Sequence, residues 1–425
     1  MSEREETVDR PLLRSRVVSG ARGYYGWTLL IAATVGMMMT APGQTLGVSI
    51  FIDQIILDLD VSRSAVSLLY TIGTLAGALS LPFIGRFIDR WGPRVGVVVI
   101  SALLALACLY MGLVNGLFML LIGFVLIRAL GQGALSLVSL HAVNIWFVRR
   151  RGLAVGIVGL GMAAATAVFP LLIEWLIGLF EWRGAYAVLG LLVALIMIPV
   201  GGIFYRVHPE RYGLKPDGRD TGAAPVEELN YTPAQVRRTR TFWLFTSGDF
   251  LVAMLSTALV FHHYSIMASS GLERVEAATI FVPIAIATAG SNLLGGMLMD
   301  RVRPRMLLSA SQVLQAATLI LAAVVAGPAP MLVYGLLLGT TQGLNGAIKA
   351  SVHAHYFGRK HIGAIKGLAS TISVAGTSVG PLVVALGFDA AGSYTPVLLA
   401  CALLPLAIAV AAPWLKPRRA NGSIV

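Results

Sequence analysis

Three charged side chains lie inside long apolar stretches of the sequence, where an ionisable group is unexpected. They are Arg128, Asp249 and Lys349. If these stretches cross a membrane, each charge costs at least about 2.5–3.5 kcal/mol at the bilayer centre, so each is a functional candidate. A guanidinium or ammonium group can bind a substrate anion, and a carboxylate beside a cation can take up and release a proton. For Arg128 the alternative is a structural role, with its guanidinium bonded to backbone carbonyls.

Polar residues accompany two of these charges at helical spacing. Gln132 follows Arg128 by four residues, so the two share a helical face. Gln342, Asn345 and Lys349 are separated by three and four residues, which also stacks them on one face. These residues are candidates for binding a substrate. For Lys349 the alternative is that its long side chain extends to the membrane surface and meets water there.

Two adjacent histidines, His262 and His263, follow Asp249 in the same apolar stretch. Neighbouring residues on a helix point about 100° apart, so we expect at most one of the two rings to face a cavity. A histidine titrates near neutral pH and can carry a transported proton or bind an anion. The alternative for each ring is a hydrogen bond to a neighbouring helix.

Other polar residues within apolar stretches are weaker candidates for a substrate-lining role. They are Gln44, Thr45, Tyr70, Thr371 and Thr377. The first two follow Pro42 and Gly43, which interrupt a helix locally and free backbone carbonyls for a ligand.

Residues for enzymatic or metal chemistry are not arranged as those functions require. His141, His353 and His355 have no cysteine or carboxylate at metal-ligand spacing, and we expect them to be solvated. Cys108 and Cys401 lie far apart in apolar segments, where we expect small buried side chains and no disulfide. No nucleophile lies beside a base, and no GxxxxGK[ST] loop is present. The sequence therefore predicts no enzyme activity, no cofactor, no metal and no ATP-driven transport by this chain.

The composition sets the class of fold that must position these residues. Of 425 residues, 57% are hydrophobic and only 12% are charged, whereas a soluble domain carries about 25% charged residues. This excludes a soluble enzyme, a nucleic-acid binder and a disulfide scaffold for the whole chain. We predict an all-α membrane protein with twelve transmembrane helices. The segments run approximately over 25–52, 62–84, 94–114, 117–146, 153–177, 184–205, 241–268, 276–299, 305–326, 329–357, 363–387 and 393–415.

One long hydrophilic stretch, 206–240, divides the chain into six spans and six spans. We therefore expect bundles at 25–205 and 241–415, with tails at 1–24 and 416–425. Lysine and arginine gather in the tails and in every second loop, which predicts cytoplasmic termini and an inner or plasma membrane location. The opposite side has only three such residues, and these are Arg63, Arg183 and Arg274. The formal net charge of +12 is thus a topology signal, and it requires no nucleic-acid partner.

The two halves resemble each other at a nearly constant offset. The segment GRFIDRWGPR at 85–94 aligns with GMLMDRVRPR at 296–305, and Pro170 aligns with Pro381. Two halves with the same topology are parallel repeats related by an axis along the membrane normal. We expect two pseudo-symmetric six-helix bundles that alternate access to a site held between them.

The segment GRFIDRWGPR resembles the signature of the major facilitator superfamily between its second and third spans. The resemblance covers nearly the whole chain and implies the fold of that superfamily. It implies that Asp89, Arg90 and Arg94, with Asp300 in the second copy, form a cytoplasmic latch that gates the transporter. The alternative for the basic residues is topology alone.

The resemblance to this superfamily also implies that spans seven and ten border the central cavity, so a pair between Asp249 and Lys349 is allowed. That pair would be a proton- or anion-sensitive switch or a purely structural ion pair.

A narrower resemblance concerns the oxalate/formate and monocarboxylate carrier branch. It is based on YYGW at 24–27, LLYTIGTLAG at 68–77, PERYGLKPDG at 209–218 and YFGRKHIGAIKG at 356–367. That branch commonly has an arginine in span eight, and its oxalate exchangers add a lysine in span eleven. Here neither span eight nor the core of span eleven (GLASTISVAGTSVGP) holds a cation, so a carboxylate would have to be neutralised from other positions.

The leading interpretation is a secondary active transporter of a small organic anion, a mono- or dicarboxylate. It would work by proton symport or anion exchange. The expected partners are the anion, protons and the lipid bilayer, and we expect a monomer. The alternative is a proton-coupled exporter of drugs or other hydrophobic compounds, although span five lacks the Gly-Pro-Gly-Gly cluster that many such exporters carry. A membrane enzyme or a receptor that does not transport is a third class.

Overall fold

The structure is a computed structural model of the 425-residue chain. It describes residues 13, 15–21, 23–147, 150–216, 231–299, 301–324, 327–357 and 362–414. All secondary structure in these residues is helical. Asp300, one of the predicted latch residues, lies outside them.

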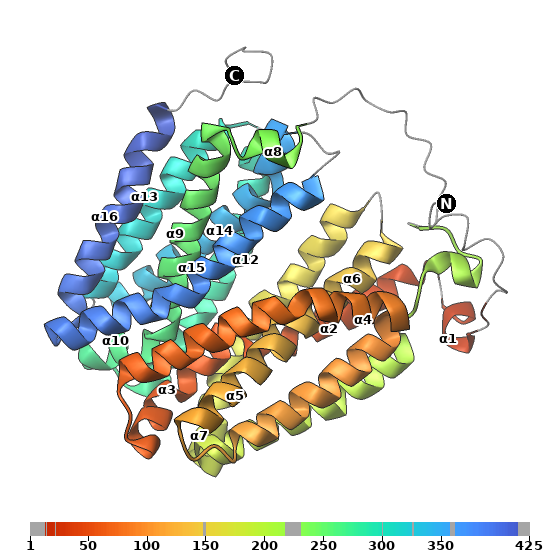
Figure 1. Cartoon of the computed structure of the whole chain (residues 1–425), viewed down its shortest axis with the longest axis horizontal. Helices are drawn as coiled ribbons and strands as arrows, with labels where there is room; N and C mark the ends of the chain where they lie inside the picture. The colour runs from red at the N-terminus through yellow and green to blue at the C-terminus, as the bar shows by residue number, and fades with distance from the viewer. Residues whose placement is uncertain are drawn as a thin grey trace. The chain divides into compact units, whose positions relative to one another are not determined.

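Helices form wherever the apolar segments run (Figure 1), because a helix satisfies every backbone N–H and C=O group within the segment. In chain order they are α1 (Arg16–Ser19), α2 (Gly26–Met38), η1 (Ala41–Gly43), α3 (Thr45–Leu59), α4 (Arg63–Met111), α5 (Leu117–Ile127), η2 (Arg128–Leu135), α6 (Ser136–Trp146), α7 (Arg151–Phe204), η3 (Pro209–Tyr212), α8 (Pro233–Val236), α9 (Arg240–Phe261), α10 (His263–Ser269), α11 (Arg274–Thr279), α12 (Phe281–Met299), α13 (Pro304–Val324), α14 (Pro328–Phe357), α15 (Ile362–Ala391) and α16 (Tyr394–Trp414).

The helices account for twelve spans. Within the described residues, nine helical stretches are long and apolar enough to cross a membrane. Two of them, α4 and α7, contain a residue with a positive φ, Gly92 at 80° and Glu181 at 56°, where the chain turns from one span into the next. Counting α4 and α7 as two spans each and adding α14 gives the twelve that the sequence predicts. Many large apolar side chains remain exposed along the helices, as lipid contact requires. Examples are Leu79, Phe118, Leu195 and Val410.

The first span differs from its prediction. The sequence indicates one segment over 25–52, but the helix breaks at Pro42, passes through the short η1 and continues as α3 to Leu59. A proline at this position removes one backbone donor and interrupts the helical ladder. The break leaves the Gly43 carbonyl free for another partner.

The chain divides into two compact units. Unit 1 comprises Met1–Gly47, Ala76–Ala165 and Trp175–Ala224, and unit 2 comprises Val48–Leu75, Thr166–Glu174 and Pro225–Val425. Unit 2 therefore combines the second half of the chain with α3, the first turns of α4 and a short part of α7. In unit 1, α2 packs against α6, and η1 packs against η2.

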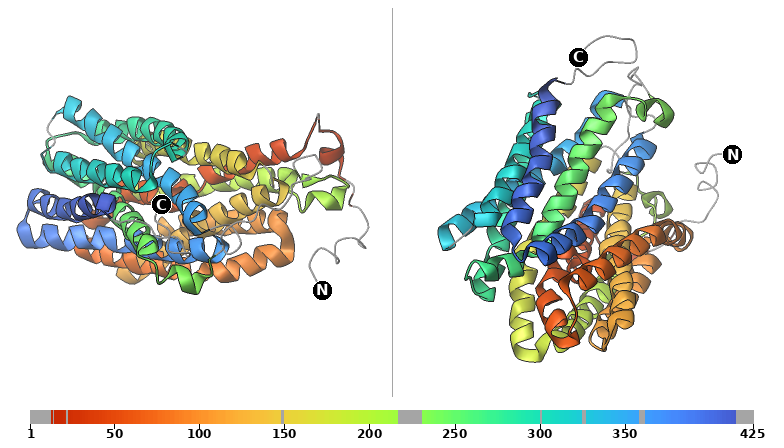
Figure 2. Two further views of the ribbon diagram at one scale, coloured as in Figure 1. Left: turned by 90° about the horizontal axis from the view of Figure 1, so that it is seen from above. Right: turned by 60° about the vertical axis from the view of Figure 1, so that its left-hand side comes forward.

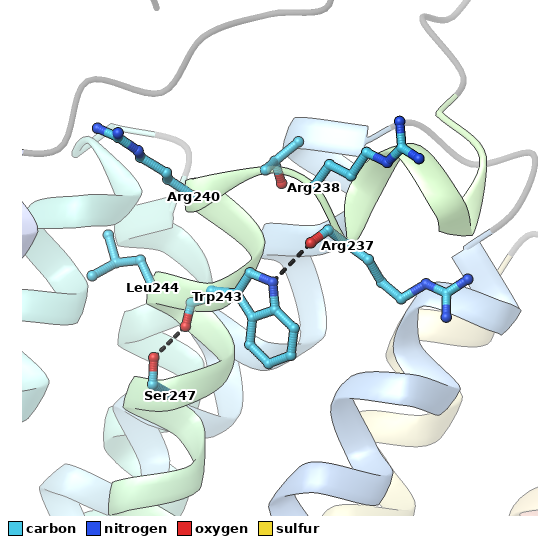
Figure 3. Close-up of a pocket in the computed structure, with 7 residues that line it drawn as sticks. Arg237, Arg238, Arg240, Trp243, Leu244 and Ser247 are labelled. Atoms are coloured by element: carbon cyan, nitrogen blue, oxygen red, sulfur yellow. Dashed lines mark hydrogen bonds between the residues drawn. The ribbon is translucent and has the colours of Figure 1, made fainter.

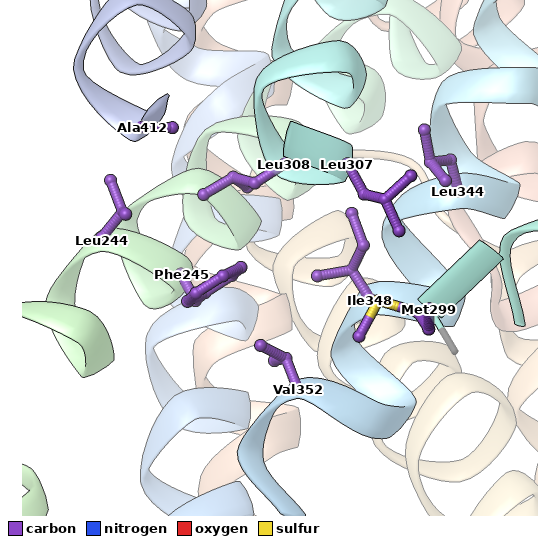
Figure 4. Packing of buried hydrophobic residues seen from close by; sticks show 9 residues of the cluster. All are labelled: Leu244, Phe245, Met299, Leu307, Leu308, Leu344, Ile348, Val352 and Ala412. Atoms are coloured by element: carbon purple, nitrogen blue, oxygen red, sulfur yellow. The ribbon is translucent and has the colours of Figure 1, made fainter. Parts of the chain in front are cut away.

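The second half of the chain packs around α9. In Figure 1, α15 lies against α9, and Figure 2 shows α13 and α16, in cyan and blue, side by side. A buried apolar cluster joins α9, α12, α13, α14 and α16 (Figure 4). Its members are Leu244, Phe245, Met299, Leu307, Leu308, Leu344, Ile348, Val352 and Ala412. This packing fixes the axial positions of α9 and α14, the helices that carry Asp249 and Lys349.

Glycines allow α15 to approach α9 closely. A Cβ atom on Gly376 would lie 2.7 Å from the Phe250 carbonyl oxygen, and one on Gly380 would lie 2.0 Å from that of Met254. Both distances are too short for a side chain, so these positions need glycine where the backbones meet. The contact at Phe250 adjoins Asp249 in sequence, so this packing brings α15 beside that carboxylate.

Candidate functional site

Four polar side chains from three helices of unit 2, Asp249 among them, form one cluster. The Lys349 Nζ atom lies 3.1 Å from Asp249 Oδ2, and Asn345 donates a hydrogen bond of 2.8 Å from Nδ2 to Asp249 Oδ1. The same Lys349 Nζ donates to the Ser373 hydroxyl at 3.0 Å. Asp249 is on α9, Asn345 and Lys349 are on α14, and Ser373 is on α15. We call these four residues the Asp249 cluster.

The helical spacing explains how α14 supplies two of these partners. Asn345 and Lys349 are four residues apart and therefore face α9 from successive turns. Each reaches a different oxygen of the same carboxylate, so both oxygens of Asp249 are bonded. A buried carboxylate is stable only with such partners, since desolvation strongly disfavours an unpaired charge.

Burial is unequal within the Asp249 cluster. The Asp249 side chain is 11% exposed, whereas that of Lys349 is 37% exposed. The carboxylate is thus held inside the bundle, while part of the lysine side chain remains exposed. The arrangement can hold a neutral ion pair, and it can exchange one partner of Lys349 for another anion.

Arg128 lies in unit 1 in a different kind of environment. It is the first residue of η2, where the helix widens to π-helical geometry over Arg128–Leu135. Such segments are rare and occur frequently at functional sites. The buried Arg128 donates from Nη1 to the Gly43 carbonyl at 2.9 Å. This is the carbonyl freed at the break in the first span, so Arg128 bonds the backbone as the structural alternative predicts.

Glycines bring the two interrupted helices together at this point. A Cβ atom on Gly43 would lie 2.8 Å from Gly131 Cα, and one on Gly131 would lie 2.8 Å from Gly43 Cα. Gln132 is half-buried in the π-helical turn, and its Oε1 atom has no hydrogen-bond partner in the described structure. Gln44 donates to the Thr40 hydroxyl at 3.1 Å. Arg128 and Gln132 therefore lie together in one polar, π-helical turn of unit 1.

The two histidines at the junction between α9 and α10 are fully buried. The His262 Nε2 atom lies 2.8 Å from the Pro381 carbonyl oxygen, and that of His263 lies 2.9 Å from the Ala277 carbonyl oxygen. Each ring thus bonds the backbone of a neighbouring helix, as the structural alternative expects. Tyr70 is also buried, with its ring centroid 4.6 Å from that of Phe261.

The remaining sequence candidates are dispersed. Gln342 and Thr45 are half-buried, Thr371 is exposed, and the hydroxyls of Thr371 and Thr377 bond carbonyls of their own helix. The expectation that His353 is solvated is wrong, because its ring is buried beside Phe242, with the ring centroids 6.1 Å apart. Cys108 and Cys401 are buried and free, as expected.

The predicted latch residues of the first repeat lie around the turn at Gly92. The Asp89 carboxylate is 69% exposed and lies 3.8 Å from His141 Nε2. Arg94 donates from Nε to the Gly202 carbonyl at 2.7 Å, and the Arg90 guanidinium lies 5.9 Å from the centroid of the Trp91 ring. All of these partners belong to unit 1.

Ser373 is the member of the Asp249 cluster that sequence reasoning missed. It lies in SVAGTSVGP, where serine and threonine are frequent, and a hydroxyl can bond its own helix or another. Only the closeness of α15 to α9 distinguishes it from its neighbours. A signal that could have found it is the pair of glycines, Gly376 and Gly380, at four-residue spacing.

A pocket of about 490 Å³ opens at the first turns of α9 (Figure 3). Its lining residues are Arg237, Arg238, Thr239, Arg240, Trp243, Leu244 and Ser247. The three arginines are exposed and point in different directions, and the Trp243 indole donates to the Arg237 carbonyl at 2.8 Å. Arginines at the end of a membrane helix are expected from topology alone.

Comparison with known proteins supports the architecture. The family model described as Major Facilitator Superfamily matches residues 28–291 and 252–423. A solved bacterial homologue of the human lysosomal transporter Spinster, described as inward-facing and unoccupied, superposes with a TM-score of 0.71 at 17% identity. It covers 92% of this chain and 96% of that chain. At this identity the likeness shows the fold, and it confirms the predicted all-α membrane architecture.

Curated relatives confirm the narrower resemblance. The Oxalate:formate antiporter of Oxalobacter formigenes is 25% identical over 53% of this chain and 52% of that protein. Monocarboxylate transporter 11 of Homo sapiens is 28% identical over 50% of this chain and 43% of that protein. The match thus spans about half the length of these two relatives. Monocarboxylate transporter 13 of Bos taurus is 23% identical over 88% of this chain and 85% of that protein.

Proposed function

Because the chain belongs to the major facilitator superfamily, a family of transporters and not of enzymes, we propose that it carries a small organic anion by alternating access. The proposed substrate is a mono- or dicarboxylate, moved with protons or in exchange for another anion. The observation that carries the proposal is the Asp249 cluster, in which a partly exposed lysine is paired with a buried carboxylate.

The charges favour joint binding of an anion and a proton. Lys349 and Asp249 together are neutral, so a carboxylate that binds to Lys349 adds an uncompensated negative charge in a medium of low dielectric constant. A proton on Asp249 removes that charge and releases Lys349 to pair with the substrate. Asn345 and Ser373 hold the two partners in place during this exchange. Proton and anion then raise each other's affinity, because linkage is reciprocal.

The relatives support the class of substrate. An oxalate:formate antiporter and monocarboxylate transporters are named for small carboxylates. Span eight and the core of span eleven, where this branch commonly places cations, hold none here, so the charge must come from elsewhere. We assign it to Lys349. For unit 1, taken by itself, Arg128 and Gln132 remain proposed substrate residues.

A thermal-shift screen of the purified protein tests the substrate class. Small mono- and dicarboxylates, sugars and lipophilic cations are compared at equal concentration, because a ligand that binds the folded state raises Tm by mass action. We expect carboxylates to raise Tm and Lys349→Gln to abolish the rise. Lys366→Gln is the matched control, because it removes a lysine from α15 that lies outside the Asp249 cluster. Stabilisation by lipophilic cations alone would indicate the drug exporter instead.

The proposed setting is the inner or plasma membrane, with both termini in the cytoplasm. It is supported by the concentration of lysine and arginine in the tails and alternate loops. In this orientation the turn at Gly92 and the start of α9 are cytoplasmic, and the α3–α4 and α10–α11 connections are extracellular. We propose a monomer, since each chain contains both repeats.

A further inference from the structure

A second charged network lies beyond the C-terminal end of α9, centred on Arg274. The Arg274 guanidinium lies 2.8 Å and 3.1 Å from the two carboxylate oxygens of Glu174, through Nε and Nη2. Its Nη1 atom lies 3.5 Å from Asp53 Oδ2. Arg63 holds the other oxygen of Asp53 at 2.7 Å. Two arginines and two carboxylates thus form one neutral chain of ion pairs, which we call the Arg274 network.

The Arg274 network joins the two repeats of the chain. Asp53 on α3, Arg63 on α4 and Glu174 on α7 come from the first repeat, whereas Arg274 begins α11 in the second. All four residues belong to unit 2. Arg274 also donates from Nη2 to the Ile50 carbonyl at 2.8 Å. One residue of the second repeat therefore binds three groups of the first.

The geometry is that of a strong interaction. The Arg274–Glu174 pair is bidentate, and a planar guanidinium matches a carboxylate in this way where a lysine does not. The side chains of Glu174 and Asp53 are only 14% and 24% exposed. The Arg274 guanidinium also lies over the Tyr264 ring, 4.8 Å from its centroid, which shields one face from water. These pairs are therefore less screened than ion pairs at an open surface.

Neutral contacts also connect the two repeats. The Thr71 hydroxyl donates to the Ser378 carbonyl at 2.7 Å, joining α4 to α15. Tyr70 packs on Phe261, joining α4 to α9. The first turns of α4 are thus joined to the second repeat by uncharged contacts as well as through the Arg274 network.

We propose that Arg274 holds a closed extracellular gate between the two repeats. When the transporter opens to the outside, α3 and the middle of α7 must separate from α11, so the pairs of Arg274 with Asp53 and Glu174 must break. Loss of Arg274 leaves the half-buried Glu174 without its cation and leaves Asp53 with Arg63 alone. The network then carries a net negative charge, which favours the separated state. Arg274 therefore sets the ratio of closed to open molecules and does not bind the substrate. This inference depends on the transporter family and the proposed orientation, and it is independent of the anion.

Distance measurements between spin labels test the gate. Leu57 lies in the last turn of α3 and Ala391 ends α15, and both are exposed. We would place labels at L57C and A391C in a background with C108A and C401A, and record double electron–electron resonance in nanodiscs. The parent should show mainly one short distance. Arg274→Gln should raise the ratio of long to short distances by about tenfold, a shift equivalent to one lost ion-pair interaction.

A charge swap and a matched control make the result specific. The double variant R274E/E174R restores the pair between positions 174 and 274 with opposite polarity. It also places a second carboxylate beside Asp53, so it should bring back part of the short-distance population. Asp389→Asn removes an exposed carboxylate near the end of α15 that lies outside the Arg274 network, and it should change nothing. If R274Q does not purify as a monodisperse protein, Arg274→Lys keeps the charge, loses the bidentate fork and should give an intermediate shift. Unchanged distances in R274Q or R274K, or an equal shift in D389N, would overturn the gate.

Discussion

At the scale of single residues, two intramembrane cations with similar sequence settings have different surroundings. Arg128 is buried and donates to the carbonyl that the Pro42 break leaves free. Lys349 remains partly exposed and pairs with Asp249. A guanidinium with several fixed donors suits a backbone carbonyl, whereas an ammonium on a flexible stem can change partners. This contrast makes Lys349 the better candidate for a substrate contact that must form and break in every cycle.

The Asp249–Lys349 pair predicts strongly non-additive mutations. Asp249→Asn and Lys349→Ala should each lower Tm, because each leaves one charge without its partner. The loss should be smaller than the about 3–5 kcal/mol typical of a fully buried pair, because the Lys349 side chain is 37% exposed. The double variant should recover much of the lost Tm. Thermal unfolding of the four proteins measures the coupling, and strictly additive losses would mean that the two side chains do not interact in the folded protein.

At the scale of elements, glycines determine which helices meet at the Asp249 cluster. Gly376 and Gly380 on α15 lie on the backbone of α9 at Phe250 and Met254. This contact places Ser373 near Lys349, although α14 and α15 are separate spans. The distances within the Asp249 cluster thus depend on backbone contacts that carry no charge.

The packing of α15 can be tested with two glycines of the same helix. Gly376→Ala places a Cβ atom 2.7 Å from the Phe250 carbonyl, so α15 must move away from α9. We expect a lower Tm and weaker carboxylate binding. Gly367→Ala is the control, since a Cβ atom there meets no other atom within 4 Å. An alanine at that exposed helical position should leave Tm unchanged or raise it, in line with a gain of about 0.5–1 kcal/mol. Equal effects of the two substitutions on Tm would contradict this account.

The sequence predicts the elements better than it predicts their interruptions. Apolar length and the positions of lysine and arginine identify all twelve spans, because transfer to lipid depends on local composition. The π-helical turn at Arg128–Leu135 is not predicted, because its geometry arises where Gly131 meets Gly43 from another helix. Candidate residues on one helix, such as Asn345 and Lys349, follow from spacing alone. Ser373 does not, since its role depends on the contact between α15 and α9.

At the scale of the whole molecule, charged residues form three separate groups. The proposed cytoplasmic latch includes Asp89 and Arg94, the Asp249 cluster lies within the spans, and the Arg274 network lies at the proposed extracellular side. The sequence shows Arg274 only as a rare cation on that side. It could not show its pairing with Glu174, one hundred residues earlier, because no periodicity links residues in different repeats.

The central claim is that a proton and a carboxylate move together through the Asp249–Lys349 pair, and proton movement in proteoliposomes tests it most directly. The vesicles contain a pH-sensitive dye, and the carboxylate with the largest effect on Tm is added outside. The wild-type protein should acidify the lumen as the carboxylate enters. Asp249→Asn should abolish this acidification while exchange of labelled for unlabelled carboxylate continues, because the amide stays neutral and cannot release a proton. Acidification by the Asp249→Asn variant at the wild-type rate, or carboxylate entry without acidification in the wild type, would contradict the account.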